Sequence, residues 1–270
     1  MPRKARKLST TNIYHIMIRG NQKQDIFLKD EDKLKFIDIL KKKKQKGEYE
    51  LYAYCLMNNH VHLLIKEKKD PISRIMQRIN ISYVNYFNHE YQQVGHLFQG
   101  RFNSEPVEDE NYLLSALSYI HKNPEEAFLV KNLEEYPWSS YYLYTQKTSQ
   151  PSFLVEQEYI LSLFSSNKDM AMKLLTQYHN ENIQKKYNFI DLLEGIKNNR
   201  NFISQSEIRQ YIQNYLKRYN FNLSNLRERK YQSHRDQLIN YLRQNSNLSI
   251  RGIANVLKIG ISTVQRTIHK

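Results

Sequence analysis

Two histidines separated by one residue, His60 and His62, have the type and spacing to do chemistry. They lie in the apolar run His60 to Ile65, which predicts a strand, and the side chains of a strand alternate between its two faces. Both imidazoles would therefore project from one face while Val61 points to the other. Two imidazoles held in this way can bind one divalent ion through neutral nitrogens. Ordinary packed or surface histidines can have the same spacing.

A tyrosine and an asparagine four residues apart, Tyr119 and Asn123, form the second candidate group. The segment 109–123 predicts a helix that the following proline, Pro124, stops, and residues four apart in a helix share a face. The apolar stripe of this helix, which includes Leu117, points elsewhere, so Tyr119 is not obviously a core residue. Asn123 could also be an ordinary helix-ending residue before proline.

Together these side chains meet the needs of phosphodiester cleavage. The reaction requires a nucleophile and an electrophile that polarises a non-bridging oxygen, and a divalent ion held by two histidines and an amide oxygen is such an electrophile. A phenol, with an ordinary pKa of about 10, is a poor nucleophile until a nearby cation favours the phenolate. A metal-binding Asn123 one turn from Tyr119 would lower the pKa of that phenol.

The elements that must position these groups follow from the hydrophobic pattern. The predicted strands are residues 12–18, 51–57, 60–65 and a short one near 97–102, with Asn58-Asn59 as the turn of a hairpin. The predicted helices are residues 30–44, 72–90 and 109–123. This order of strands and helices predicts an α+β fold in which helices pack on an antiparallel sheet.

Charge and composition narrow the class of partner. The 270 residues include 41 Lys and Arg against 27 Asp and Glu, a formal net charge of +14, which attracts polyanions such as nucleic acid or an anionic membrane. No apolar stretch is long enough to span a bilayer and nothing resembles a signal peptide, so we expect a cytoplasmic protein that binds nucleic acid and no membrane. The single cysteine, Cys55, excludes an intrachain disulfide and is expected in the core.

An ordered set of motifs resembles those of the REP-associated tyrosine transposases, a group within the single-tyrosine HUH transposases of bacterial insertion sequences. In chain order the motifs are Tyr14-His15-Ile16 with Arg19-Gly20-Asn21, Met57 to Leu64, His96 to Phe102, Tyr119 to Pro124, and Trp138 to Tyr141. The resemblance covers roughly residues 8 to 145. We therefore expect a catalytic domain at 1–145, a helical region of unknown role at 146–232, and a tail at 233–270.

The resemblance implies a ferredoxin-like, RRM-like HUH nuclease fold and specific roles for four residues. His60 and His62 would bind Mg²⁺ or Mn²⁺ with Asn123 as third ligand, a position where related enzymes often carry glutamine. Tyr119 would form a transient bond to a DNA 5′-phosphate and release a 3′-hydroxyl, which can later attack the phosphotyrosine without ATP. His15 could support the metal site without being a ligand, or be a packed or surface histidine.

The family acts on single-stranded DNA, often beside the imperfect hairpin of a repeat, as a monomer or a homodimer. The expected DNA contacts in this part of the chain are Arg3, Lys4, Arg6, Arg19, Gly20 and Arg101. The basic start could equally be a solvated tail. Aromatic residues between the basic segments suit stacking on unpaired bases, although most of them are expected in the core.

The tail, residues 233–270, resembles a helix-turn-helix. Ser262 and Gln265 have the spacing of a capping box, which predicts that a helix begins at Ser262. The residues early in this helix that would reach base edges are Thr263, Gln265 and Arg266. Lys258 occupies the turn position where glycine is common, so the alternative is a helical docking module. A true helix-turn-helix would add duplex binding near the cut site.

Other functions stay open at the level of sequence. An HUH replication initiator or relaxase would use the same groups to nick plasmid or phage DNA, although the context of Tyr119 favours a transposase. A catalytically silent DNA-binding regulator derived from a transposase would bind without cutting, although all four proposed active-site residues are present. A hydrolytic zinc site is less favoured, because Leu64 stands where an H-x-H-x-D arrangement needs a carboxylate.

Overall fold

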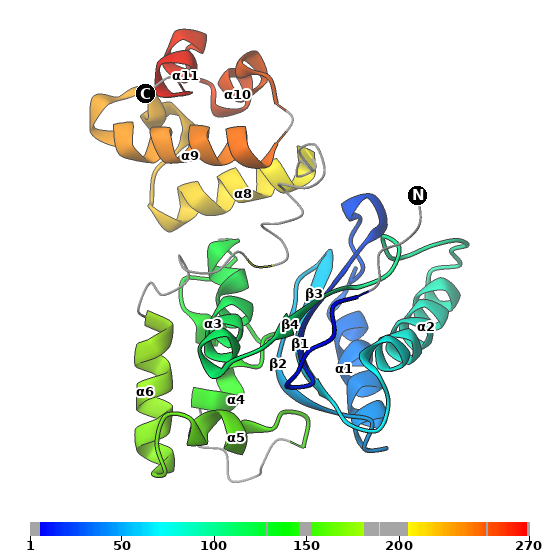
Figure 1. The fold of residues 1–270 in the computed structure, drawn as a ribbon. Helices are drawn as coiled ribbons and strands as arrows, with labels where there is room; N and C mark the ends of the chain where they lie inside the picture. Colours follow the sequence, from blue (N-terminus) through cyan, green and yellow to red (C-terminus); the bar gives the residue numbers. More distant parts are fainter. Residues whose placement is uncertain are drawn as a thin grey trace. The chain divides into compact units, whose positions relative to one another are not determined.

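A computed structural model describes residues 6–127, 129–145, 153–180, 189, 205–246 and 248–268. The chain divides into two compact units, each with its own core (Figure 1). The N-terminal unit comprises Met1–Glu126 with Asn132–Ile190, and the C-terminal unit comprises Ala127–Lys131 with Asp191–Lys270. The predicted domain bounds at 145 and 232 stay a prediction.

The sheet of the N-terminal unit is antiparallel, with its strands in the order β2-β3-β1-β4. The strands are β1 (Ile13–Arg19), β2 (Tyr49–Leu56), β3 (His60–Glu67) and β4 (Asn103–Val107). This order, with helices joining β1 to β2 and β3 to β4, is the ferredoxin-like arrangement, and the predicted α+β fold is confirmed. Nearly every residue of β1 and β2 is buried because helices cover both faces of the sheet.

Helices α1 (Asp30–Lys44) and α2 (Ile72–Glu90) pack on one face of the sheet, with the bounds that the sequence predicted (Figure 1). Helix α3 (Glu110–Glu126) crosses the other face and contacts β2, β3 and β4. The helices α4 (Tyr141–Thr145) and α6 (Lys168–Asn180) pack together beside it, and α5 (Gln157–Ser162) contacts α6. Short 3-10 turns lie at Asn21–Lys23 and Leu133–Glu135. Among the described helices, none is long and apolar enough to cross a membrane.

Two predicted boundaries are wrong, and proline is involved in both. The fourth strand lies at 103–107 and not near 97–102, because Gly100 adopts a left-handed conformation and the strand starts beyond it. β4 contains Pro106, which its edge position tolerates, because in the described sheet β4 pairs with β1 alone. Helix α3 does not stop at Pro124 but continues to Glu126, since one proline removes only one backbone donor.

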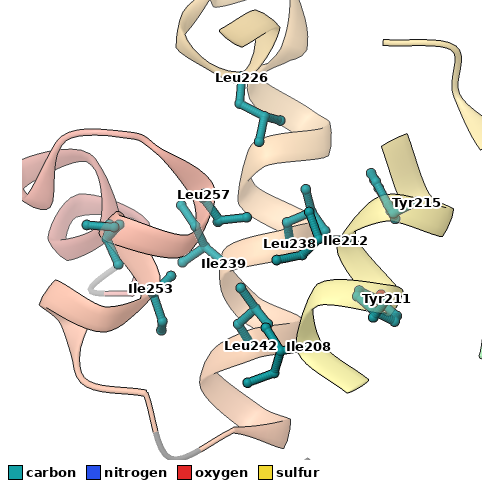
Figure 2. Close-up of a cluster of buried hydrophobic side chains, with 12 residues drawn as sticks. Ile208, Tyr211, Ile212, Tyr215, Leu226, Leu238, Ile239, Leu242, Ile253 and Leu257 are labelled. Atoms are coloured by element: carbon teal, nitrogen blue, oxygen red, sulfur yellow. The ribbon is translucent and has the colours of Figure 1, made fainter. Parts of the chain in front are cut away.

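In its described residues the C-terminal unit is helical, as predicted. Its helices are α8 (Gln205–Arg218), α9 (Gln232–Asn245), α10 (Ile250–Leu257) and α11 (Ile261–Ile268), with 3-10 turns at Leu223–Arg227 and Arg229–Tyr231. Figure 2 shows the apolar side chains that α8, α9 and α10 contribute to one cluster. Helices α9, α10 and α11 contact one another, and the rings of Tyr211 and Tyr241 stack with centroids 3.6 Å apart. This unit therefore has its own core.

Candidate active site

The register of the sheet gathers the strand residues of the site on one face. In the antiparallel pairing of β1 with β3, Arg19 stands opposite His60 and Met17 opposite His62. Cross-strand partners project from the same face, and residues two apart on a strand share it, so His15 joins this set. The rings of His60 and His62 lie with centroids 5.0 Å apart, which confirms that both imidazoles project from the same face.

Helix α3 brings Tyr119 to this face. Its ring centroid lies 5.7 Å from that of His62 and 5.8 Å from that of His15, each in an edge-to-face arrangement. A phenol carried on a helix and an imidazole pair carried on a strand therefore converge, although almost sixty residues separate them in the sequence. This convergence is the central geometric requirement of a tyrosine nucleophile working beside a histidine-bound metal.

Tyr119 is a core residue, which the apolar pattern of its helix did not indicate. Its side chain is only 6% exposed. The ring of Phe189 stacks on it, with centroids 4.3 Å apart and an interplanar angle of 21°, and Phe189 is itself 1% exposed. Phe189 also contacts His15 and Tyr112. Sequence analysis gave no signal for Phe189, since it follows α6 and is remote from every motif.

Hydrogen bonds engage the same nitrogen of both strand histidines. Nδ1 of His60 lies 2.6 Å from Oδ1 of Asn59, and Nδ1 of His62 lies 3.0 Å from Nε2 of His15. In each ring Nε2 is then the nitrogen that could bind a metal. His15 and His62 are completely buried, and Asn59 is 8% exposed. Of the two readings of His15, support of the metal site from outside the ligand set is the one that this geometry favours.

The donor set suits a divalent ion only if an amide takes part. Among the described residues, no three His, Cys, Asp or Glu side chains converge as a metal site. A third protein ligand would therefore be of another type, as the asparagine expected at 123 is. Asn123 is 8% exposed, and its Nδ2 donates to the carbonyl of Tyr119 at 3.0 Å. Its Oδ1 is the atom that could bind a metal, and this role stays a prediction.

His121, which also belongs to a motif, takes part in a separate buried network. Its Nδ1 lies 2.9 Å from Nε2 of His179, and its Nε2 lies 2.8 Å from Oγ of Ser140. Nδ1 of His179 donates to the carbonyl of Leu175 at 2.8 Å. Burial lowers the pKa of His121 well below its usual range and that of His179 to about 4. This network joins α3 to α6 and to the Trp138–Tyr141 motif, so it holds the helix that carries Tyr119.

The basic residues that were expected to contact DNA differ in whether the structure describes them and in what they contact. Arg3 and Lys4 lie outside the described residues. The guanidinium of Arg6 lies 3.8 Å from the ring centroid of Phe102 and donates to its carbonyl at 3.2 Å. Burial and the neighbouring charge of Arg101 lower the pKa of Arg6, so these two cations lie close together. Contact of any of them with DNA stays a prediction.

Gly20 has a structural explanation. A Cβ at this position would lie 2.0 Å from the carbonyl oxygen of Gln24 and 3.0 Å from a side-chain carbon of Ile26. Its amide donates to the carbonyl of Asn59 at 2.9 Å, which ties the end of β1 to the hairpin turn before His60. The glycine is therefore required by close packing next to the site, and direct contact with DNA is an additional expectation.

The aromatic residues near the basic segments are mostly core residues, as expected. Tyr83, Phe87, Phe98 and Phe102 are buried, and the hydroxyls of Tyr86 and Tyr91 both donate to the buried carboxylate of Asp32. Cys55 is also completely buried, which confirms its place in the core. These side chains stabilise α1, α2 and the sheet.

The tail folds into the two helices that the motif predicted, with one correction. Helix α11 begins at Ile261 and not at Ser262, so Ser262 lies inside the helix and does not cap it. The amides of Thr263 and Val264 bond to the carbonyl of Gly260, which stands at the N-terminus instead. Lys258 adopts the left-handed conformation, with φ of 53°, at the turn position where glycine is common. Gln265 and Arg266 are exposed, and Thr263 is half-buried.

Comparisons with known proteins bear on this site. Residues 9–123 match the profile of a family described as "Transposase IS200 like". One similar solved structure, a REP-associated tyrosine transposase bound to a REP hairpin, is 18% identical, with 52% of this chain and 82% of that chain covered and a TM-score of 0.44. Another, described as a transposase of Deinococcus radiodurans, is 18% identical, with 45% and 97% covered and a TM-score of 0.33. Curated proteins gave no match.

Proposed function

We propose that this chain, whose residues 9–123 match the profile of the IS200-like transposase family, cleaves and rejoins single-stranded DNA. Tyr119 would be the nucleophile, and His60, His62 and Asn123 would bind Mg²⁺ or Mn²⁺. The observation that carries the proposal is the convergence of the Tyr119 ring with the His62 ring, 5.7 Å apart by centroid. A divalent ion bound there would polarise a non-bridging phosphate oxygen and favour the phenolate.

The two chemical steps balance without a co-reactant. The phenolic oxygen of Tyr119 forms a bond to phosphorus as the bond from phosphorus to the 3′-oxygen breaks. The phenol loses its proton to solvent and the leaving 3′-oxygen takes one up, which yields a 5′-phosphotyrosine and a free 3′-hydroxyl. Attack of a 3′-hydroxyl on the phosphotyrosine reverses these bonds and joins the strands. Arg19, which stands opposite His60 in the register, would bind a neighbouring phosphate.

The decisive experiment detects a covalent adduct. The full chain is incubated with Mg²⁺ and a labelled single-stranded oligonucleotide that carries a hairpin, and denaturing gels report protein joined to DNA. We expect an adduct with the wild type, none with Tyr119→Phe, and an undiminished one with Tyr159→Phe, whose tyrosine lies on α5 and is partly exposed. DNA binding without any wild-type adduct would instead support the silent regulator.

The type of DNA separates the transposase from its HUH alternatives. The same assay is run with oligonucleotides from hairpin-flanked chromosomal repeats and from plasmid origins. We expect cleavage beside the hairpin and none at the origins. Preferential nicking at an origin would support a replication initiator or relaxase instead.

A second proposal concerns the C-terminal unit, in which α9, α10 and α11 would bind duplex DNA as a helix-turn-helix. Ile253, Leu257 and Val264 are buried between these helices, while Gln265 and Arg266 are exposed on α11 and would reach base edges. Loss of one base contact costs about 1–3 kcal/mol of discrimination. We expect Gln265→Ala with Arg266→Ala to weaken duplex binding and leave adduct formation on a single-stranded oligonucleotide intact. An equal loss in the exposed control Arg209→Ala would contradict base reading.

A further inference from the structure

We infer that Asn59 and His15 are positioning residues that hold the imidazoles of His60 and His62 in the tautomer that metal binding requires. The inference rests on the proposed function, because it concerns the same metal site. Two contacts carry it: Oδ1 of Asn59 lies 2.6 Å from Nδ1 of His60, and Nε2 of His15 lies 3.0 Å from Nδ1 of His62. Neither residue touches the reacting atoms, so both would act through the ligands.

The first contact allows one proton position. The oxygen of an asparagine amide can only accept, so the facing Nδ1 of His60 must carry the proton. The other end of the same amide, Nδ2, donates to the carbonyl of Lys23 at 3.5 Å, which keeps the oxygen turned toward His60. A neutral His60 with its proton on Nδ1 has a lone pair on Nε2, as a metal ligand needs.

The hairpin turn is held firmly enough for this contact to persist. The carbonyl of Asn59 accepts from the amide of Gly20 at 2.9 Å, and the amide of Met57 donates to the carbonyl of His60 at 2.9 Å. The turn that contains Asn59 is thus closed by one backbone bond and joined to the end of β1 by another. Since any side chain at Gly20 would clash with Gln24, the close approach of β1 to this turn is built into the sequence.

The second contact has two possible proton arrangements, and only one is compatible with a metal. If His62 donates from Nδ1 to Nε2 of His15, then Nε2 of His62 has a lone pair. If His15 donates instead, a neutral His62 carries its proton on Nε2 and cannot be a ligand through that atom. A metal on His62 would therefore select the first arrangement. Because His15 and His62 are both completely buried, water cannot easily replace the contact.

Matched variants separate hydrogen bonding from packing. His15→Leu and Asn59→Leu remove the acceptor, whereas His15→Gln and Asn59→Asp keep an oxygen that can accept from Nδ1. The control is His89→Leu, which removes an exposed imidazole on α2. Mn²⁺ binding to the full chain is measured by calorimetry. Loss of a residue that orients a ligand typically weakens metal binding by about 10- to 100-fold. We expect that loss in His15→Leu and Asn59→Leu, and wild-type or tighter binding in His15→Gln, Asn59→Asp and His89→Leu.

A second measurement reads the tautomer directly. Nitrogen-15 NMR of the histidine-labelled wild type, saturated with Mg²⁺, is expected to show the proton of His60 and of His62 on Nδ1. A proton on Nε2 of either ring overturns the inference, even if the Leu variants fail to fold. If folded His15→Leu and Asn59→Leu bind Mn²⁺ as tightly as the wild type, the inference is also overturned, while the proposed function stands. If the wild type binds no Mn²⁺, the metal site itself is ruled out. The proposed DNA cleavage and the inference about Asn59 and His15 then both fail.

Discussion

The N-terminal unit contains two buried pairs of hydrogen-bonded histidines, and they differ in what their remaining nitrogens do. In the pair His121 and His179, every ring nitrogen is used inside the core, by the partner ring, by Ser140 or by the carbonyl of Leu175. In the pair His15 and His62, both rings contact Tyr119 edge to face, and His62 belongs to the proposed metal site. The contact between His121 and His179 and the contact between His15 and His62 have similar lengths. The first belongs to a structural network and the second to the proposed metal site.

Burial and a hydrogen bond therefore do not identify a functional histidine. His121 is within a motif and two residues from Tyr119, yet its bonds connect α3 to the core behind it. His15 is more than a hundred residues from Tyr119 in the chain but lies next to it in space. What separates the two pairs is the face of α3 on which each lies, and this suggests experiments that affect one pair at a time.

The largest expected effect is the loss of cleavage when His62 is changed. A metal contributes several kcal/mol to a phosphoryl transition state, so His62→Ala should lower adduct formation by about a thousandfold or more. His121→Ala should instead lower the free energy of unfolding by about 2–3 kcal/mol, because the partners Ser140 and His179 lose a buried hydrogen bond.

Urea unfolding and adduct formation are measured on both variants under conditions where they are folded. Adduct formation by His121→Ala should fall only in proportion to its unfolded fraction. A thousandfold loss in folded His121→Ala, or near-normal activity in folded His62→Ala, would reverse the roles assigned to the two pairs.

The next effect is a dependence of the free energy of unfolding on pH that arises from the buried pair His121 and His179. Burial lowers the pKa of His179 to about 4, with Lys122 acting in the same direction, while an unfolded histidine has a pKa of about 6.5. Above pH 6.5 neither state binds the proton. As the pH falls toward 4 the unfolded state binds it and the folded state does not, so stability falls by up to about 3 kcal/mol from His179 alone.

Urea midpoints between pH 7.5 and 5 measure this slope, over a window in which most carboxylates stay ionised (roughly above pH 5). His179→Gln, which cannot take up the proton, should show a shallower slope than the wild type. An unchanged slope in this variant would mean that the acid sensitivity arises elsewhere.

Local periodicity predicted the parts of the site that lie within one element. The spacing of His60 and His62 on a strand, and the bounds of α1 and α2, follow from patterns of two and of three to four residues. The fold followed from the order of those elements. The contact of His15 with His62 could not be predicted from the order of the elements. It depends on which strands are neighbours and on their register, and no local pattern contains that information.

The burial of Tyr119 was missed for a related reason. A helix of a two-layer fold is expected to bury one stripe, but α3 is covered on several sides, by the sheet, by α6 and by Phe189, so its residues are buried almost without a break from Leu113 to Pro124. The residue that stacks on Tyr119 comes seventy positions later in the chain. Polarity along the helix alone could not reveal a cover supplied from so far away.

The smallest expected effect concerns Phe189. Because its ring stacks on Tyr119 and both are nearly inaccessible, Phe189→Ala should expose the phenol and leave His60 and His62 in place. Nitration by tetranitromethane, followed by mass spectrometry of the peptide that contains Tyr119, should increase severalfold. Phe153→Ala, which removes an 83% exposed ring, should leave it unchanged. If Tyr119 stays unreactive in a folded Phe189→Ala chain, the sheet face and not Phe189 protects the phenol. A DNA strand would then have to reach Tyr119 from the side of the histidines.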